Sequence, residues 1–175
     1  MGRHVALAEL NDADLSTLAD EMGWLQVGAS PDGDASWLGG GMDARITWHQ
    51  VDSAYGALIV EGSDAELLLA DLANGFALLD DVDVLDRIAA ATTPRELAGW
   101  VPRLAQFARG TFQQATFGVM LGLLTSERME FVAAMVQGLR HARWQELLEP
   151  LEDVARRHME LKPFCEAAIA SIKTR

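Results

Sequence analysis

The side chains best suited to binding a ligand lie in two basic segments towards the C-terminal end of the chain. The first is Arg140-His-Ala-Arg143, followed directly by Trp144, and the second is Arg156-Arg157. A guanidinium group binds phosphate or carboxylate through several hydrogen bonds in one plane, and aromatic rings pack well beside it. If the segments lie on adjacent helices, they could meet at one end of a helix pair and bind an anion. The alternative is structural, because arginine near a helix C-terminus complements the helix dipole and Trp144 can cover the core.

A second group of candidates is acidic. Asp80, Asp81 and Asp83 stand close together, with Asp86 after them. Clustered carboxylates are typical calcium ligands, but an EF-hand loop needs glycine at its sixth position and glutamate at its twelfth, and neither is present. Acidic residues before and within the first turn of a helix are favoured by the helix dipole in any case. We therefore expect no metal here and keep the three aspartates as binding candidates only.

Motifs for other chemistry are missing from the sequence. It contains no HExxH pair, no Gly-x-Ser-x-Gly segment, and no lysine after the glycines of 39–41. The four histidines are far apart, and the only cysteine, Cys165, falls on the apolar side of an expected helix, where a buried thiol is the usual finding. We predict no catalytic residue, no metal and no cofactor.

The charge is unevenly distributed. The whole chain carries −12, and residues 1–100 hold four arginines against eighteen Asp and Glu, a net charge of −14, whereas residues 101–175 have +2. An acidic surface repels nucleic acid and anionic lipid and attracts basic surfaces. We therefore expect no nucleic acid and no membrane as partner, but another, basic protein. The alternative is that the acidic residues only maintain solubility.

Composition agrees with an ordinary globular protein. Half of the 175 residues are hydrophobic, and no apolar run reaches the ~18 residues of a membrane span. The first residues show no apolar segment of a secretion signal, and a single cysteine excludes an internal disulfide. The expected location is the cytoplasm.

The first part of the chain predicts a helix followed by a small antiparallel sheet. Asn11 or Asp12 can cap a helix over 11–23, with leucines spaced to form one apolar side. Short strands are expected at 24–27, 36–38, 45–50 and 55–60, with a turn at 30–34. A meander of this size needs a covering helix to be stable.

From Ser63 onward the sequence predicts helices. Two capping boxes, Ser63 with Glu66 and Thr93 with Glu96, mark helix starts. Further helices are expected at about 111–124, 127–141, 144–159 and 162–173, with Pro102 and Pro150 causing kinks or splits. The predicted division is therefore 1–62, with the helix and meander, and 63–175, with the helical domain.

Two of these helices match each other in pattern. Residues 131–139 and 164–172, thirty-three positions apart, place apolar residues at the same five positions along one helical face. Helix pairs that recur at such a period are typical of stacked-helix repeats, which usually form binding surfaces.

The segments 46–64 and 125–147 resemble bacterial HEAT-repeat proteins, in which a small strand-containing N-terminal region precedes HEAT-like helix pairs. The likeness covers about residues 44–173, and the start at Ser126-Glu-Arg128 is similar to the second helix of a HEAT unit. The resemblance implies a scaffold or partner-binding role and supplies no catalytic residues.

Together these features predict a mainly α protein, a short HEAT-like α-α repeat stack with a small N-terminal helix and antiparallel β-meander. The expected function is that of a non-catalytic protein-binding module, such as an immunity or adaptor protein that presents an acidic surface to a basic partner. One alternative is a HEAT-like enzyme acting on a small ligand or nucleic acid through Arg140, Arg143 and Trp144. Another is a structural subunit that oligomerises.

Overall fold

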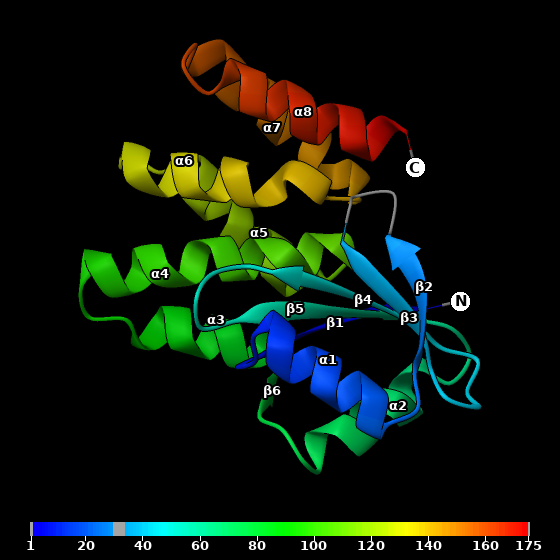
Figure 1. Cartoon of the computed structure of the whole chain (residues 1–175). Coiled ribbons are helices and arrows are strands. Elements are labelled where there is room, and N and C mark those ends of the chain that lie inside the picture. The colour runs from blue at the N-terminus through cyan, green and yellow to red at the C-terminus, as the bar shows by residue number, and fades with distance from the viewer. Residues whose placement is uncertain (1, 30–33, 175) are drawn as a thin grey trace. The chain divides into compact units, whose positions relative to one another are not determined.

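The computed structural model describes residues 2–29 and 34–174. The chain divides into two compact units, residues 1–80 and residues 81–175 (Figure 1). No helix in the described ranges is both long enough and apolar enough to cross a membrane.

The first unit is built on a six-stranded antiparallel sheet with the strand order β2-β3-β4-β5-β1-β6. Strands β2 to β5 form a meander, and β1 lies between β5 and the short β6 at the far edge. The strands are β1 (Arg3–Ala8), β2 (Leu25–Ala29), β3 (Ala35–Leu38), β4 (Arg45–Gln50), β5 (Gly56–Glu61) and β6 (Leu78–Leu79).

Helix α1 (Asp12–Glu21) begins and ends as its sequence predicts. The Asn11 side chain accepts hydrogen bonds from the backbone N–H groups of Ala13 and Asp14 at 2.9 and 3.0 Å, which caps the N-terminus. Gly23 follows the helix with a φ of 66°, a conformation that costs glycine little, and directs the chain into β2. The predicted helix at 11–23 is confirmed.

One face of the sheet packs against α1 and α2 (Ala65–Ala73). The two helices and the sheet share a single buried cluster, whose members from the sheet include two tryptophans. Helix α1 contributes Leu15, Leu18 and Ala19, spaced to fall on one side of the helix. The sheet contributes Trp37, Ile46, Trp48, Leu58 and Val60. This packing fixes α1 over the β2-β3-β4 half of the sheet at Trp37 and Trp48.

The second unit is helical throughout its described residues. Its helices are α3 (Asp81–Ala90), α4 (Pro94–Ala105), α5 (Gln114–Leu124), α6 (Met129–Gly138), α7 (Leu148–Arg157) and α8 (Lys162–Lys173), with 3₁₀ helices η1 (Gln106–Arg109), η2 (Leu139–His141) and η3 (Gln145–Leu147) between them. Helix α4 packs against α3 and α6, and α8 packs against α7 and α6 (Figure 1). The capping box of Thr93 and Glu96 is present at the start of α4 and confirms that prediction.

The expected mainly α fold is wrong, because the protein is mixed α/β and is not a pure stack of helical repeats. Strands β1 and β6 were not predicted from the sequence, and β1 occupies an interior position in the sheet. Its partner β5 begins 48 residues after β1 ends, since Ala8 pairs with Gly56. The sheet is therefore the framework of the first unit and not a small appendage to a helical stack.

The two helices that match in pattern lie in different surroundings. Phe131 in α6 is buried, whereas Phe164, its counterpart in α8, is 47% exposed. The leading aromatic residue of the pattern is thus a core residue in one helix only.

The segment 63–80, expected in the helical domain, belongs to the first unit. Helix α2 contacts β1 and β5, and β6 pairs with β1. The capping box expected at Ser63 is wrong, because α2 begins at Ala65 and Ser63 donates its hydroxyl hydrogen bond to Asp43 at 2.8 Å instead.

The two prolines act differently on their helices. Pro102 lies inside α4, which ends at Ala105 and continues as η1. Pro150 lies in the first turn of α7, after η3, so the single helix expected at 144–159 is split. Most of the turn expected at 30–34 lies outside the described residues.

Candidate binding surface

Trp144, expected beside a ligand, is a core residue. Its side chain is 3% exposed, and its indole N–H donates a 2.9 Å hydrogen bond to the carbonyl oxygen of Gly110. The ring also meets the edge of Phe112, with the ring centroids 5.1 Å apart. Arg143 donates its backbone N–H to the carbonyl of Ala108, and Arg140 is exposed on η2. The segment therefore ties the start of η3 to the chain around Gly110.

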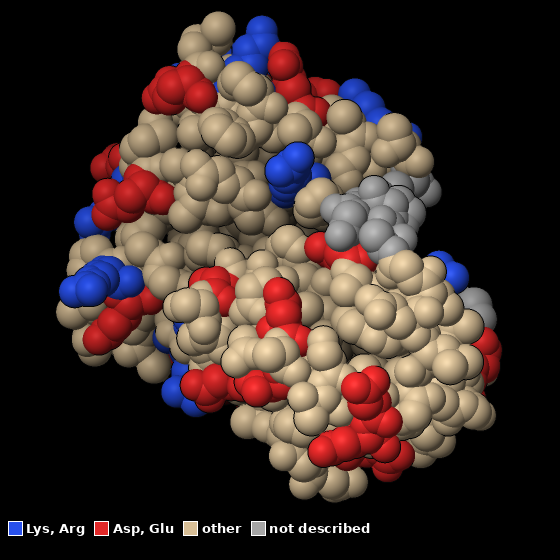
Figure 2. All heavy atoms as spheres, in the orientation of Figure 1, with Lys and Arg blue, Asp and Glu red and all other residues tan. Residues whose placement is uncertain are grey.

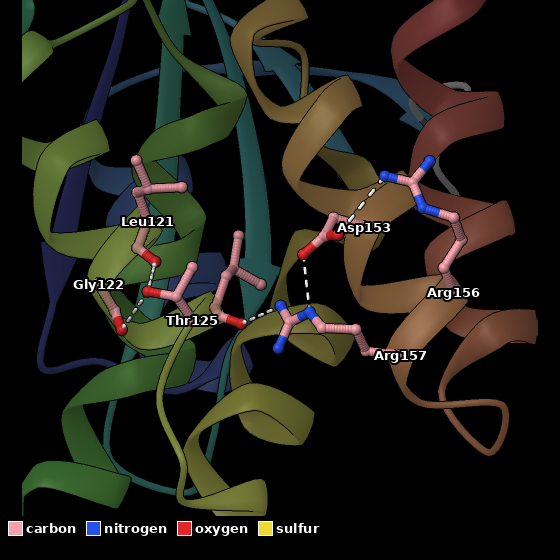
Figure 3. A network of polar contacts seen from close by, with 7 residues as sticks. Leu121, Gly122, Thr125, Asp153, Arg156 and Arg157 are labelled. Carbon is pink, nitrogen blue, oxygen red and sulfur yellow. Dashed lines mark hydrogen bonds and ion pairs between the residues drawn. The ribbon is translucent and has the colours of Figure 1, made fainter.

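Arg157 closes the C-terminal end of α5 (Figure 3). Its guanidinium donates to the Asp153 carboxylate at 2.7 Å and to the carbonyl oxygen of Leu124, the last residue of α5, at 3.3 Å. A cation at this position satisfies a carbonyl that the helix leaves unpaired and complements the negative end of the dipole. The Thr125 hydroxyl bonds the carbonyl of Leu121 in the same turn. The side chain of Arg157 thus joins α7 to α5.

Arg156 also contacts Asp153, but more weakly. The distance from its Nη2 to the second carboxylate oxygen is 3.5 Å, and its side chain is 68% exposed (Figure 3). Hydrogen bonding and charge from Arg157, and to a smaller extent from Arg156, hold the pKa of Asp153 below its ordinary value. Asp153 therefore pairs with both arginines that the sequence indicated as ligand-binding residues.

The aspartates at the start of α3 also make a structural contact. Asp81 accepts a 2.7 Å hydrogen bond from the hydroxyl of Thr116 in α5, which fixes one helix to the other. Asp80 and Asp83 carry exposed side chains. No group of three or more His, Cys, Asp or Glu side chains in the described part of the chain could hold a metal ion.

The net negative charge of the chain comes entirely from the first unit. Residues 1–80 contain two arginines and fourteen Asp and Glu, a net charge of −12, whereas residues 81–175 contain twelve of each sign. One of the two arginines, Arg3, forms an ion pair with Glu61 on the neighbouring strand β5. The first unit therefore accounts for the whole net charge of −12 of the chain.

Five of the fourteen acidic residues of the first unit lie on and beside α1. We define the α1 acidic surface as five exposed carboxylates with no basic residue between them, and Figure 2 shows acidic side chains over this part of the molecule. The five residues are Glu9, Asp12, Asp14, Asp20 and Glu21.

A pocket of about 410 Å³ opens beside this surface, between α1 and strands β2 to β4. Its apolar part consists of Leu15, Trp37 and Trp48, and its polar part includes the carboxylates of Asp12 and Asp34. The remaining lining residues are Ser16, Gln26, Ala35, His49 and Gln50. A pocket of this size is within the range of ligand-binding sites.

Two hydrogen bonds hold the charged groups of the pocket. The indole N–H of Trp48 donates to Oδ1 of Asp12 at 2.7 Å, and Nδ1 of His49 lies 2.8 Å from Oδ1 of Asp34. The Asp34 side chain is only 10% exposed and that of His49 is 28% exposed. Neighbouring strand residues normally point to opposite faces, yet both Trp48 and His49 line this pocket.

Comparison of the chain with protein-family models, with curated proteins and with solved structures found no match. A function can therefore be inferred only from the charges, contacts and pocket of the described residues. The sequence indicated Asp12 as one of two possible helix caps and placed Trp48 within a strand, and the 35 residues between them contain no signal that the two meet. The pocket was therefore not predicted from the sequence.

Proposed function

We propose that this protein is a non-catalytic binding module that captures a basic protein partner through the α1 acidic surface. The observation that supports this proposal is that the whole net charge of −12 lies in residues 1–80 while the rest of the chain is neutral overall. Net negative charge concentrated in one unit attracts an oppositely charged protein to that unit and increases the association rate. An immunity or adaptor role, in which a basic partner is held or neutralised, is the specific form of this proposal.

The alternative, an enzyme that acts on a small ligand or nucleic acid through Arg140, Arg143 and Trp144, has less support. The ring of Trp144 is buried and its only hydrogen-bond donor is already used by Gly110. Arg157 binds Asp153 and a helix carbonyl. Trp144 and Arg157 are therefore engaged within the fold, whereas Arg140 and Arg156 are exposed.

Capture of the tagged protein's partner from a lysate of its own host, at about 0.05 M and about 0.3 M salt, tests the proposal. The comparison is with a charge-reversed variant, E9K/D20K/E21K, whose three exposed sites lie just before α1 and at its C-terminal end. The matched control is E127K/E146K/E160K, which changes the net charge equally through three exposed glutamates of the second unit.

We expect one basic protein to be retained at low salt by the wild type and by the control, and lost both from the α1 variant and at the higher salt. A partner that the α1 variant retains as well as the wild type would contradict the proposal. So would a protein that is captured alone at both salt concentrations. A mass that rises with concentration, measured on the purified protein, would favour the oligomerising subunit instead.

A further inference from the structure

We propose that the pocket between α1 and strands β2 to β4 receives an arginine side chain of the partner, an inference that rests on the proposed function. The pocket combines two carboxylates with two tryptophans, and no lysine or arginine is among its described lining residues. Carboxylates pair with guanidinium through two parallel hydrogen bonds, and aromatic rings attract the same cation. Both features select a cation and reject an anion.

The carboxylate of Asp12 is positioned in advance. The Trp48 indole N–H binds Oδ1 at 2.7 Å, and an ionised carboxylate has about four acceptor sites, so Asp12 can bind a cation at the same time. Trp48 is itself fixed, because it is 3% exposed and lies over Gly56, where a Cβ atom would come within 1.9 Å of ring atom Cζ2. A ligand would therefore find the carboxylate and the ring already in place, which lowers the entropic cost of binding.

The dimensions suit an arginine side chain rather than a bare ion. A volume of about 410 Å³ exceeds what one charged group needs. Trp37 and Trp48, which are 6% and 3% exposed, offer a small apolar surface to the methylene stem, while the carboxylates receive the charged end. Arginine suits this arrangement better than lysine. Its planar guanidinium can stack on an aromatic ring while its N–H groups donate hydrogen bonds within the guanidinium plane.

The position of the pocket identifies a protein as the source of that side chain. Asp12 belongs both to the pocket and to the α1 acidic surface, so a basic protein attracted to the surface brings its arginines to the pocket. The α1 acidic surface would increase the rate of association with the partner. The pocket, at the edge of that surface, would bind one arginine side chain specifically.

The test uses the full chain and ¹H–¹⁵N NMR, with acetyl-arginine amide as the probe. The neutral isostere acetyl-citrulline amide serves as the ligand control. The reporter is the indole N–H resonance of Trp48, assigned by its absence from the Trp48→Phe spectrum. We expect a saturable shift with the arginine compound and none with the citrulline compound.

Two matched variants then locate the binding. Asp12→Asn should weaken probe binding at least about tenfold, because it removes a charged acceptor. Asp14→Asn makes the same change of charge in the same helical turn, outside the pocket, and should leave binding within about twofold of the wild type. Equal shifts with both compounds, no shift up to about 50 mM probe, or wild-type binding by the Asp12→Asn variant would overturn the inference.

Failure here is distinguishable from failure of the proposed function. The residues changed in E9K/D20K/E21K do not line the pocket, so that variant tests the acidic surface alone. If Asp12→Asn abolishes probe binding but captures the partner normally, the pocket takes a free guanidinium compound and the inference about the partner is wrong. If no partner depends on the α1 acidic surface, the proposed function fails regardless of the probe.

Discussion

The indole N–H of Trp48 and the carboxylate of Asp12 form a 2.7 Å hydrogen bond that links strand β4 to the first turn of helix α1. Trp48 belongs to the buried cluster of the first unit, whereas Asp12 is exposed. A single contact thus connects the core of this unit to its acidic surface, and it lies in the wall of the pocket. Changes to either residue should affect both stability and binding.

We predict that Trp48→Phe lowers the free energy of unfolding by about 1–3 kcal/mol. The change removes the N–H donor and part of a buried ring, but leaves an aromatic side chain against the helix. Urea denaturation followed by circular dichroism measures the effect. In a double-mutant cycle with Asp12→Ala, a coupling free energy of about 1 kcal/mol is expected, and strict additivity would show that the hydrogen bond contributes nothing.

The close approach of α4 and α6 requires a glycine. A Cβ atom at Gly138 in α6 would lie 2.6 Å from Cβ of Ala105 in α4 and 3.4 Å from the backbone of Pro102. We predict that Gly138→Ala destabilises the protein by about 1–3 kcal/mol, because the two helices must separate.

The control for this steric argument is Gly99→Ala in α4. Nothing lies within 4 Å of a Cβ atom there, and alanine favours the helix, so we expect a gain of about 0.5–1 kcal/mol. Thermal unfolding of the two variants, compared with the wild type, should therefore give shifts of opposite sign. A higher melting temperature for both variants would mean that helix propensity, and not contact between α4 and α6, decides the outcome.

The two arginines at the end of α7 should differ in their contribution to stability. Arg157 contacts both Asp153 and the last carbonyl of α5, while Arg156 makes one long contact from an exposed position. We predict a loss of about 0.5–1 kcal/mol for Arg157→Ala and almost none for Arg156→Ala. Urea denaturation at low and high salt checks this, and equal losses would show that the contact with α5 is unimportant.

The local parts of the fold could be predicted from sequence. The cap at Asn11, the capping box at Thr93 and strand β4 depend on residues that are close in the chain, and all three are confirmed. The box at Ser63 failed because a distant residue, Asp43, binds Ser63 more favourably than the helix end does. Capping patterns describe local preference only, and a tertiary partner can override them.

The interior strand β1 and the pocket could not be predicted in this way. Strand β1 has six residues and forms because β5 and β6 flank it, and neither is near it in sequence. The pocket depends on bringing α1 onto β4, which places Asp12 against Trp48. Periodicity locates single elements, but it contains no information on which elements become neighbours.

The thiol of Cys165 should be unreactive in the folded protein. The residue is fully buried in α8, as the sequence analysis predicted, and burial raises the pKa of its thiol to about 11. At pH 8 only about one molecule in a thousand carries the reactive thiolate, and a reagent must also reach the buried sulfur. We predict no labelling by a disulfide reagent over an hour at pH 8 and complete labelling in urea. Rapid stoichiometric labelling without denaturant would contradict the buried position of Cys165.

The capping box at the start of α4 should make stability depend on pH in the acid range. Glu96 accepts hydrogen bonds from the backbone N–H of Thr92 at 2.9 Å and of Thr93 at 3.3 Å, and these bonds lower its pKa below the ordinary value of 4.5. A carboxyl whose pKa is lower in the folded state stabilises the fold when it is ionised. Its contribution is therefore complete above the ordinary pKa and is lost as the pH falls through the lowered one.

We expect Glu96→Gln to reduce the melting temperature above about pH 5 and to approach the wild type as the pH decreases towards 3. The control is Glu127→Gln, which changes the charge equally at an exposed residue between α5 and α6. Melting curves at half-unit pH intervals measure the difference. A gap that stays constant from pH 7 to pH 3 would mean that the glutamate stabilises α4 by its shape and helix propensity, because only an effect of its charge can disappear on protonation.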